Sequence, residues 1–285
     1  MYNLKSHHLA VYFMQSIFTL ISLSLLMLCS PLAGAFPKQS LVPGGIALID
    51  LKRVDKTPNF SFKDKPVLTV LHQGTSMAIV GLSLNLKPGK HFIQGSWGEE
   101  KSLQKIFFSI VDKQYTTQRI EIKDKRKVNP YAKDMDRILS EKKRKQKARL
   151  VFTPMRVNVD LLQPVEGIMT GSYGRRRIFN GQKKRPHSGM DIAADQGTPV
   201  LAPAAGKIIE LGDFFFSGNM VYIDHGQGLI TMFAHLSKTH VELGQSIQKG
   251  DVIGEVGATG RVTGPHLHWS LGLNGTWINP ELFLN

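Results

Sequence analysis

Residues 264–269 read Gly-Pro-His-Leu-His-Trp, and this stretch constrains the fold and the site of the C-terminal part of the chain. We expect a strand over residues 266–273, in which side chains two positions apart point to the same face. His266 and His268 would then project together while Leu267 faces a core. Two adjacent imidazoles seldom serve packing, so we interpret them as one metal ligand with a second histidine beside the metal.

A second motif lies upstream, where residues 186–191 read Pro-His-Ser-Gly-Met-Asp. A bend at Gly189 can turn His187 and Asp191 toward one ion. Imidazole and carboxylate together suit a borderline cation such as Zn²⁺. Taken alone, a histidine and an aspartate four positions apart are weak evidence for a metal site.

A third motif is the stretch 229–236, in which period-2 alternation places Thr231, Phe233 and His235 on one face. A lone histidine at a strand end is usually structural. A catalytic zinc site needs about three protein ligands and one open position for water. Zinc lowers the pKa of such a water toward about 7, and neighbouring histidines can then move protons or stabilise an oxyanion.

The pattern around these motifs predicts a mainly β protein. Residues 161–285 contain Gly-rich turns and almost no helical periodicity, and they are numerous enough to fold alone as an antiparallel β-sheet domain. Residues 36–122 alternate apolar and polar positions in short runs, which favours an N-terminal β-sandwich. The strands expected there are at 45–51, 67–71, 77–82 and 106–111, and those in the C-terminal unit are at 206–211, 220–225, 229–235, 252–256 and 266–273.

Residues 123–160 form a basic linker and a lead-in segment. Between residues 123 and 150, twelve Lys and Arg stand against four Asp and Glu, and good helix formers follow Pro130. We expect a solvated linker helix. The alternative is an electrostatic tether to an anionic wall.

Residues 1–35 predict a signal peptide. Lys5 precedes an apolar stretch from about residue 9 to residue 29, and Ala-Gly-Ala at residues 33–35 is a small-x-small cleavage signal. The alternatives are an uncleaved anchor, because about 20 apolar residues can span a bilayer, and a lipoprotein modified at Cys29. Leu28 disfavours the lipoprotein because a small residue should stand there.

Charge and cysteine content limit the function classes. The formal charge of +14, less Lys5, leaves +13 on the chain after residue 35, which favours polyanions or anionic surfaces. Nucleic acid fits by charge, but export argues against it, so we expect no nucleic-acid partner. Cys29 is the only cysteine, which excludes a cysteine nucleophile and a cysteine-containing zinc site in the exported chain.

Taken together, the motifs resemble the lysostaphin/LytM-type metallopeptidases, which cut peptide bonds in peptidoglycan. The resemblance covers residues 164–280. Its landmarks stand in order at residues 171–176, 187–193, 197–200, 202–206, 224–229, 234–236, 250–254 and 259–268. The resemblance also extends to residues 42–45, 88–89 and 125–130, which are similar to the β-sandwich domain that precedes this peptidase in some Gram-negative proteins.

The resemblance implies a role for each matching position. His187, Asp191 and His268 become the ligands of one Zn²⁺ per chain, and His235 and His266 become the catalytic pair. Asn180 matches a substrate-side position, from which an Asn can occupy the open coordination site in latent relatives. His225 matches a structural position, and His240 matches none. One departure is local, because many relatives have Glu soon after the H-x-H motif where this chain has Trp269-Ser270.

The resemblance also implies a function. We expect a zinc endopeptidase secreted across the inner membrane into a Gram-negative periplasm, cutting the bond from D-Ala to a diaminopimelate-type residue of peptidoglycan. Peripheral contact with the anionic envelope and a regulatory protein partner are further candidates. The alternatives are a non-catalytic activator or scaffold of other cell-wall hydrolases, although such relatives typically lose metal ligands, and a basic polyanion-binding module. The N-terminal domain would bind wall or partner, shield the groove, or act as a spacer.

Overall fold

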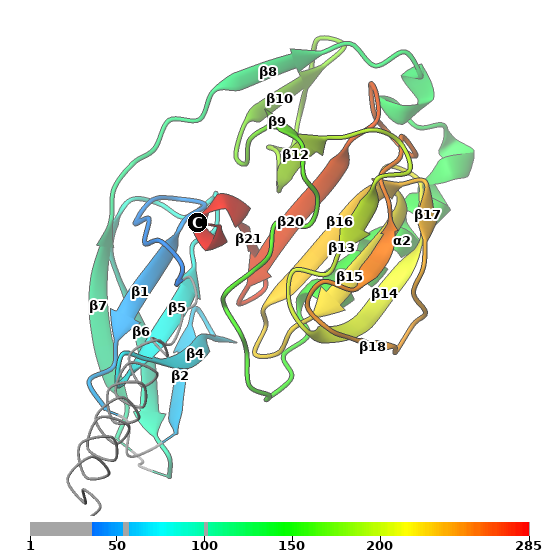
Figure 1. Cartoon of the computed structure of the whole chain (residues 1–285). Helices are drawn as coiled ribbons and strands as arrows, with labels where there is room; N and C mark the ends of the chain where they lie inside the picture. The colour runs from blue at the N-terminus through cyan, green and yellow to red at the C-terminus, as the bar shows by residue number, and fades with distance from the viewer. Residues whose placement is uncertain (1–35, 54–56, 100–101, 285) are drawn as a thin grey trace, which may run out of the picture. The chain divides into compact units, whose positions relative to one another are not determined.

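One large sheet organises the C-terminal part of the chain, as a computed structural model of residues 36–53, 57–99 and 102–284 shows (Figure 1). Its strands follow the order β18-β14-β15-β16-β20-β12-β9, and β21 pairs with β20. Every neighbouring pair in it is antiparallel. Its strands are β9 (Ile168–Gly171), β12 (Met190–Ala193), β14 (Gly206–Phe214), β15 (Gly218–Asp224), β16 (Ile230–Leu236), β18 (Ser246–Ile247), β20 (Leu267–Leu273) and β21 (Thr276–Ile278).

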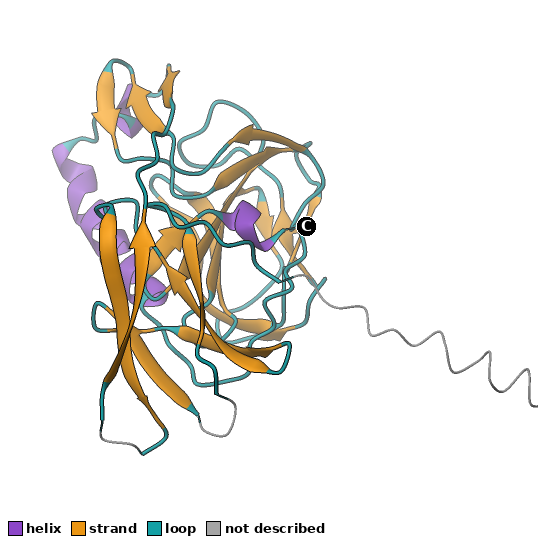
Figure 2. Cartoon of the chain, turned by 90° about the vertical axis from the view of Figure 1, so that its left-hand side faces the viewer, coloured by secondary structure: helices purple, strands orange, loops and turns teal. Residues whose placement is uncertain are grey.

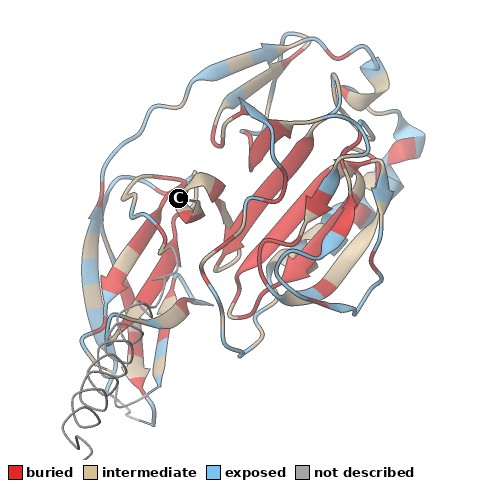
Figure 3. Ribbon diagram, viewed as in Figure 1, coloured by how far each residue is buried: buried red, intermediate tan, exposed pale blue. Residues whose placement is uncertain are grey.

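The two faces of this sheet are covered differently. Phe233, Trp269 and Leu271 belong to the main hydrophobic core, and this face also packs against a small sheet of order β13-β19-β17. That small sheet consists of β13 (Pro199–Leu201), β19 (Val252–Glu255) and β17 (Lys238–Thr239). On the opposite face, Met232 and Ala234 belong to a second buried cluster. Figure 3 shows the central strands β16 and β20 as largely buried.

The helix α2 (Met135–Arg149) covers part of that second face (Figure 2). Ala148 is buried in the same cluster as Phe214 and Tyr222. Glu141 is also buried and accepts hydrogen bonds from the backbone N–H of Phe215 at 2.9 and 3.0 Å and from Arg137 at 2.6 Å. The helix expected in the basic segment is therefore present, but it is not a solvated linker because one of its faces packs on the sheet.

The N-terminal part is a β-sandwich. One sheet has the order β1-β5-β4 and the other the order β3-β2-β6-β7. Apolar side chains of both sheets, among them Val80, Phe60 and Trp97, form one buried cluster. The strands are β1 (Ile46–Asp50), β2 (Pro58–Phe62), β3 (Lys65–Pro66), β4 (Leu68–His72), β5 (Thr75–Gly81), β6 (Gly89–Trp97) and β7 (Gln104–Ile110). The mainly β fold with an N-terminal sandwich, as expected from the sequence, is confirmed.

A further three-stranded sheet, of order β11-β10-β8, connects the segment that follows the sandwich with the segment that precedes the metal motif. Strand β8 (Thr117–Ile120) pairs in parallel with β10 (Arg176–Phe179), which forms a hairpin with β11 (Gln182–Lys184). The sequence placed residues 117–120 in the sandwich, but their pairing partner lies beside the metal motif. Short 3-10 helices occur at η2 (Lys125–Lys127), η3 (Ala132–Asp134) and η4 (Pro280–Phe283).

The predicted signal peptide lies outside the described residues, and its cleavage stays a prediction. In the part of the chain that the structure describes, no helix combines the length and the apolar character needed to cross a membrane.

Candidate metal centre

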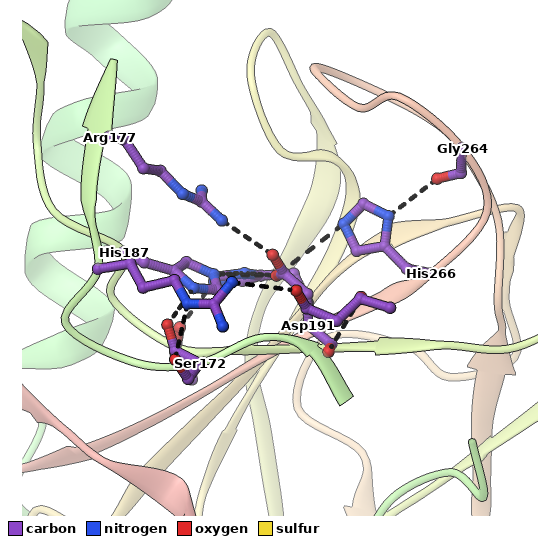
Figure 4. Close-up of polar contacts among 10 residues, drawn as sticks. Ser172, Arg177, His187, Asp191, Gly264 and His266 are labelled. Carbon is purple, nitrogen blue, oxygen red and sulfur yellow. Dashed lines mark hydrogen bonds and ion pairs between the residues drawn. The ribbon is translucent and has the colours of Figure 1, made fainter. Parts of the chain in front are cut away.

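Three buried side chains converge at the junction of β12 and β20. The register of these strands places Asp191 directly opposite His268, so both project from the same face. His268 Nδ1 lies 2.7 Å from Asp191 Oδ1 and 3.0 Å from His187 Nε2. His187 Nε2 lies 2.9 Å from Asp191 Oδ1. The structure therefore brings the three predicted ligands His187, Asp191 and His268 into one cluster. Figure 4 labels two of them, His187 and Asp191.

The hydrogen bonds around the cluster leave its inner atoms free to bind a cation. His187 Nδ1 lies 2.9 Å from the carbonyl oxygen of Ser172, and because a carbonyl only accepts, Nδ1 carries the proton and Nε2 the lone pair. His268 Nε2 lies 2.9 Å from Ser270 Oγ, which can accept a hydrogen bond from Nε2–H and so leaves the lone pair on Nδ1. Two imidazole nitrogens and one carboxylate oxygen then face one another. Three such donors fit Zn²⁺ with a further position for water.

Ser270 lies in the segment after the H-x-H motif where the sequence departs from the family pattern that it resembles. Where the resemblance leads us to expect Glu shortly after the H-x-H motif, this chain places the Ser270 hydroxyl 2.9 Å from His268 Nε2. Burial lowers the pKa of His268 to about 4, although Asp191 opposes this shift. The ring is therefore neutral near pH 7, as a histidine that ligates a metal must be.

Asp191 remains a carboxylate in this buried position. Burial alone would raise its pKa, but the close polar contacts of Oδ1 with the His187 and His268 rings outweigh that effect and lower it. Its second oxygen, Oδ2, accepts a hydrogen bond from Arg177 at 2.8 Å. Sequence reasoning missed Arg177, because three consecutive arginines at residues 175–177 do not show which one turns inward.

Two glycines permit this close packing. A Cβ on Gly171, which pairs with Asp191, would lie 2.4 Å from Asp191 Oδ2. A Cβ on Gly189 would lie 2.3 Å from the carbonyl oxygen of Trp269. Any larger residue at either position would push the ligand strands apart.

His266 and His235 form a second group beside the cluster. His266 Nδ1 lies 2.9 Å from the carbonyl oxygen of Gly264, and its Nε2 lies 3.9 Å from Asp191 Oδ1 (Figure 4). The ring centroid of His235 lies 4.9 Å from that of His266 and 6.0 Å from that of His268. His235 Nδ1 lies 2.8 Å from the carbonyl oxygen of Thr259, so Nε2 is the ring atom that can accept a proton.

His235 reaches this group by a different route from the one the sequence predicted. Strict alternation would place it with Phe233, whose side chain belongs to the main core. The pairing of β15 with β16 shifts register near His235, and His235 has a φ of +67°, in the left-handed region. Such a bulge re-aims one side chain out of the alternation. The predicted shared face for Thr231, Phe233 and His235 is therefore wrong. Burial, with smaller contributions from His268 and His266, lowers the pKa of His235 well below its usual value.

Asn180 does not join the cluster through its side chain. Its Oδ1 accepts a hydrogen bond from the Ile122 N–H at 2.7 Å, and its Nδ2 donates to the Ile122 carbonyl at 3.0 Å. Both ends of the amide therefore hold the segment after β8. The predicted substrate contact stays a prediction, and the observed contacts are structural.

The variant Asn180→Gly distinguishes a structural role of Asn180, through Ile122, from the predicted contact with substrate. The φ of Asn180 is +48°, a conformation that glycine adopts without strain. We expect the loss of two partly buried hydrogen bonds to lower the free energy of unfolding by about 1–3 kcal/mol, measured by urea unfolding, with KM unchanged. A raised KM at wild-type stability would instead support the substrate contact.

The remaining histidines of this domain have other partners. His225 is buried between the Ala205 carbonyl and the Thr231 hydroxyl, each at 2.8 Å, and burial lowers its pKa to about 4. His240 lies 2.8 Å from Glu255 Oε1. Neither belongs to the cluster.

Comparisons with known proteins place this site in a family. The profile described as "Peptidase family M23" matches residues 185–280, and that of its N-terminal domain matches residues 39–113. A crystal structure of a putative M23 peptidase from Pseudomonas aeruginosa is 38% identical, with 86% of this chain and 96% of that chain aligned and a TM-score of 0.73. The chain therefore belongs to peptidase family M23.

Two curated relatives match the C-terminal domain. The peptidoglycan DD-endopeptidase ShyA of Vibrio cholerae is 39% identical over 39% of this chain and 26% of its own length. The DD-carboxypeptidase/endopeptidase Mpg of Neisseria meningitidis is 49% identical over 34% of this chain and 22% of its own length. The aligned region thus spans about a quarter of each relative.

Proposed function

We propose that the protein is a zinc-dependent endopeptidase that hydrolyses peptide cross-links of bacterial peptidoglycan in the periplasm. The observation that carries the proposal is the convergence of His187 Nε2, Asp191 Oδ1 and His268 Nδ1 within 2.7–3.0 Å of one another. Zinc held by these three atoms would supply the Lewis acidity that peptide hydrolysis needs.

The protein's own groups perform the proton transfers. His235 and His266 each donate Nδ1–H to a backbone carbonyl, which fixes the ring and leaves Nε2 as the acceptor. One of these nitrogens takes a proton from the attacking water and returns it to the leaving amine as the C–N bond breaks. The protonated imidazole is also a hydrogen-bond donor for the oxyanion.

The proposal of which peptidoglycan bond is cut rests on the names of two relatives. ShyA is named as a peptidoglycan DD-endopeptidase, and Mpg as a DD-carboxypeptidase/endopeptidase. A bond from D-Ala to a diaminopimelate-type residue is the cross-link that such an activity would cut. The alternative of a non-catalytic activator is disfavoured because all five predicted metal and catalytic side chains are present and grouped.

Digestion of purified sacculi tests the proposal. The protein from residue 36 should release soluble muropeptides, lose this activity with a chelator, and regain it with about one equivalent of zinc. Mass spectrometry of the products should show a new diaminopimelate amine and no cut in the glycan. Intact sacculi under zinc-replete conditions, together with stimulation of a separate amidase, would favour the activator.

A further inference from the structure

Arg261 has no role in the site described so far. It lies between Thr259, whose carbonyl holds His235, and His266. Its Cζ is 4.8 Å from the centroid of the Phe179 ring and 4.6 Å from that of Phe216. Its backbone N–H donates to the Phe216 carbonyl at 2.9 Å. Rings packed on a planar guanidinium leave its edge, where the N–H groups point, for hydrogen bonding.

The charge of Arg261 has no counter-charge among the residues that the structure describes. None of their carboxylates is within ion-pairing distance, and its guanidinium makes one long hydrogen bond, 3.3 Å from Nη1 to the Lys127 carbonyl. Burial and the neighbouring charge of Arg177 lower the pKa of Arg261 to about 10. A half-buried guanidinium without an anion is energetically costly, and binding an anion offsets that cost.

The surroundings add positive rather than negative charge. Lys145 lies close enough to Arg261 and Arg185 for both to oppose its protonation, although burial is the larger cause of its lowered pKa. The carboxylates nearby already have partners. Asp191 is bound by Arg177 and two histidines, as described above, and Glu141 by Arg137 and the Phe215 N–H.

Arg261 is linked to the metal centre through Phe179 and Arg177. The Phe179 ring lies 4.8 Å from Cζ of Arg261 and 5.8 Å from Cζ of Arg177. Arg177 donates to Asp191 at 2.8 Å. One aromatic ring therefore lies between Arg261 and the arginine that contacts a metal ligand.

We propose that Arg261 binds the carboxylate next to the scissile amide of the peptide substrate. This inference rests on the proposed function. In a cross-link from D-Ala to diaminopimelate, the carbon that bears the leaving nitrogen also bears a free carboxylate. The planar fork of arginine matches a carboxylate with two parallel hydrogen bonds. The long contact to the Lys127 carbonyl would give way to this stronger partner.

Two soluble cross-linked dimers test the inference, one with that carboxylate free and one with it converted to a carboxamide. A hydrogen-bonded charge pair corresponds to a preference of about 10- to 100-fold in kcat/KM for the free carboxylate. Arg261→Met should lose most of this preference through a raised KM on the free form, with the amidated dimer cut at the wild-type rate. An uncross-linked peptide ending in diaminopimelate, which the enzyme cannot cleave, should bind more weakly to the variant by the same factor in calorimetry.

Arg176→Met is the matched control, because Arg176 is an exposed arginine on the same strand as Arg177, and among the described residues its guanidinium hydrogen-bonds to Gln114 alone, at 3.3 Å. It should keep the wild-type preference. If Arg261→Met does not fold, Arg261→Gln is measured in the same way. If the Arg261 variant digests sacculi and keeps the full preference for the free carboxylate over the carboxamide, this inference is wrong and the proposed function stands. Arg261-dependent binding of the peptide by a protein that digests no sacculi would overturn the proposed function and leave the binding site standing.

Discussion

His268→Ala should abolish zinc binding and sacculus hydrolysis together. Its Nδ1 is one of three inner atoms, 2.7 Å from Asp191 Oδ1 and 3.0 Å from His187 Nε2. Two remaining ligands fall short of the three that a catalytic zinc site uses. Because losing even an outer partner of a ligand costs about 10- to 100-fold in metal affinity or activity, we expect at least the upper end of that range. Zinc per chain after gel filtration and dye release from labelled sacculi measure the two effects.

His225→Ala is the matched control. It also removes a buried imidazole from the same domain, with hydrogen bonds to Ala205 and Thr231 but no contact with the cluster. We expect a lower melting temperature with one zinc per chain retained. If His268→Ala kept zinc at wild-type affinity, the assignment of the metal site would be wrong.

The parts of the site that the sequence predicted depend on short-range geometry. The H-x-H motif needed only the two-residue period of a strand, and the burial of Leu267 in the main core confirms the alternation. His187 and Asp191 are four positions apart, so a single bend brings them together. The pairing of Asp191 with His268 across 77 residues was available only through the family resemblance.

The parts that the sequence missed depend on tertiary contacts. Arg177 turns toward Asp191 because β10 lies beside the cluster, and the basic helix packs on the sheet through Ala148 and Glu141. Strand β8 pairs with β10 rather than with the sandwich. Composition identified the helix as basic, but the pattern of charges does not show which face a neighbouring sheet will bury.

The bulge at His235 shows most clearly what a sequence pattern cannot predict. It is also the basis of the second prediction with a large expected effect. A period-2 pattern cannot show where a strand gains an extra residue, yet that residue brings the imidazole to the metal centre. His235→Gly should lower kcat by about 10²- to 10⁴-fold, the usual contribution of a positioned proton-transfer group. Zinc content should stay at one per chain, because His235 is not among the three converging ligands.

Glycine is the informative substitution because the φ of His235 is +67°. Alanine would lose the imidazole and also keep a strained left-handed conformation, which costs about 1–3 kcal/mol. A comparison of His235→Gly with His235→Ala therefore separates chemistry from stability. Both should show the same fall in kcat, and only alanine a clear fall in melting temperature. His240→Ala, which removes a histidine paired with Glu255 away from the cluster, should change neither.

The double variant of His235 and His266 then tests whether the two rings act as one unit. Their centroids are 4.9 Å apart, and each ring is fixed by its own backbone carbonyl. If the proton transfer needs both rings, the double variant should lose little more activity than either single variant, because groups that act together are strongly non-additive. If His266 suffices, His235→Gly would remain within threefold of wild type, and His235 would be a packing residue brought to the site by the bulge.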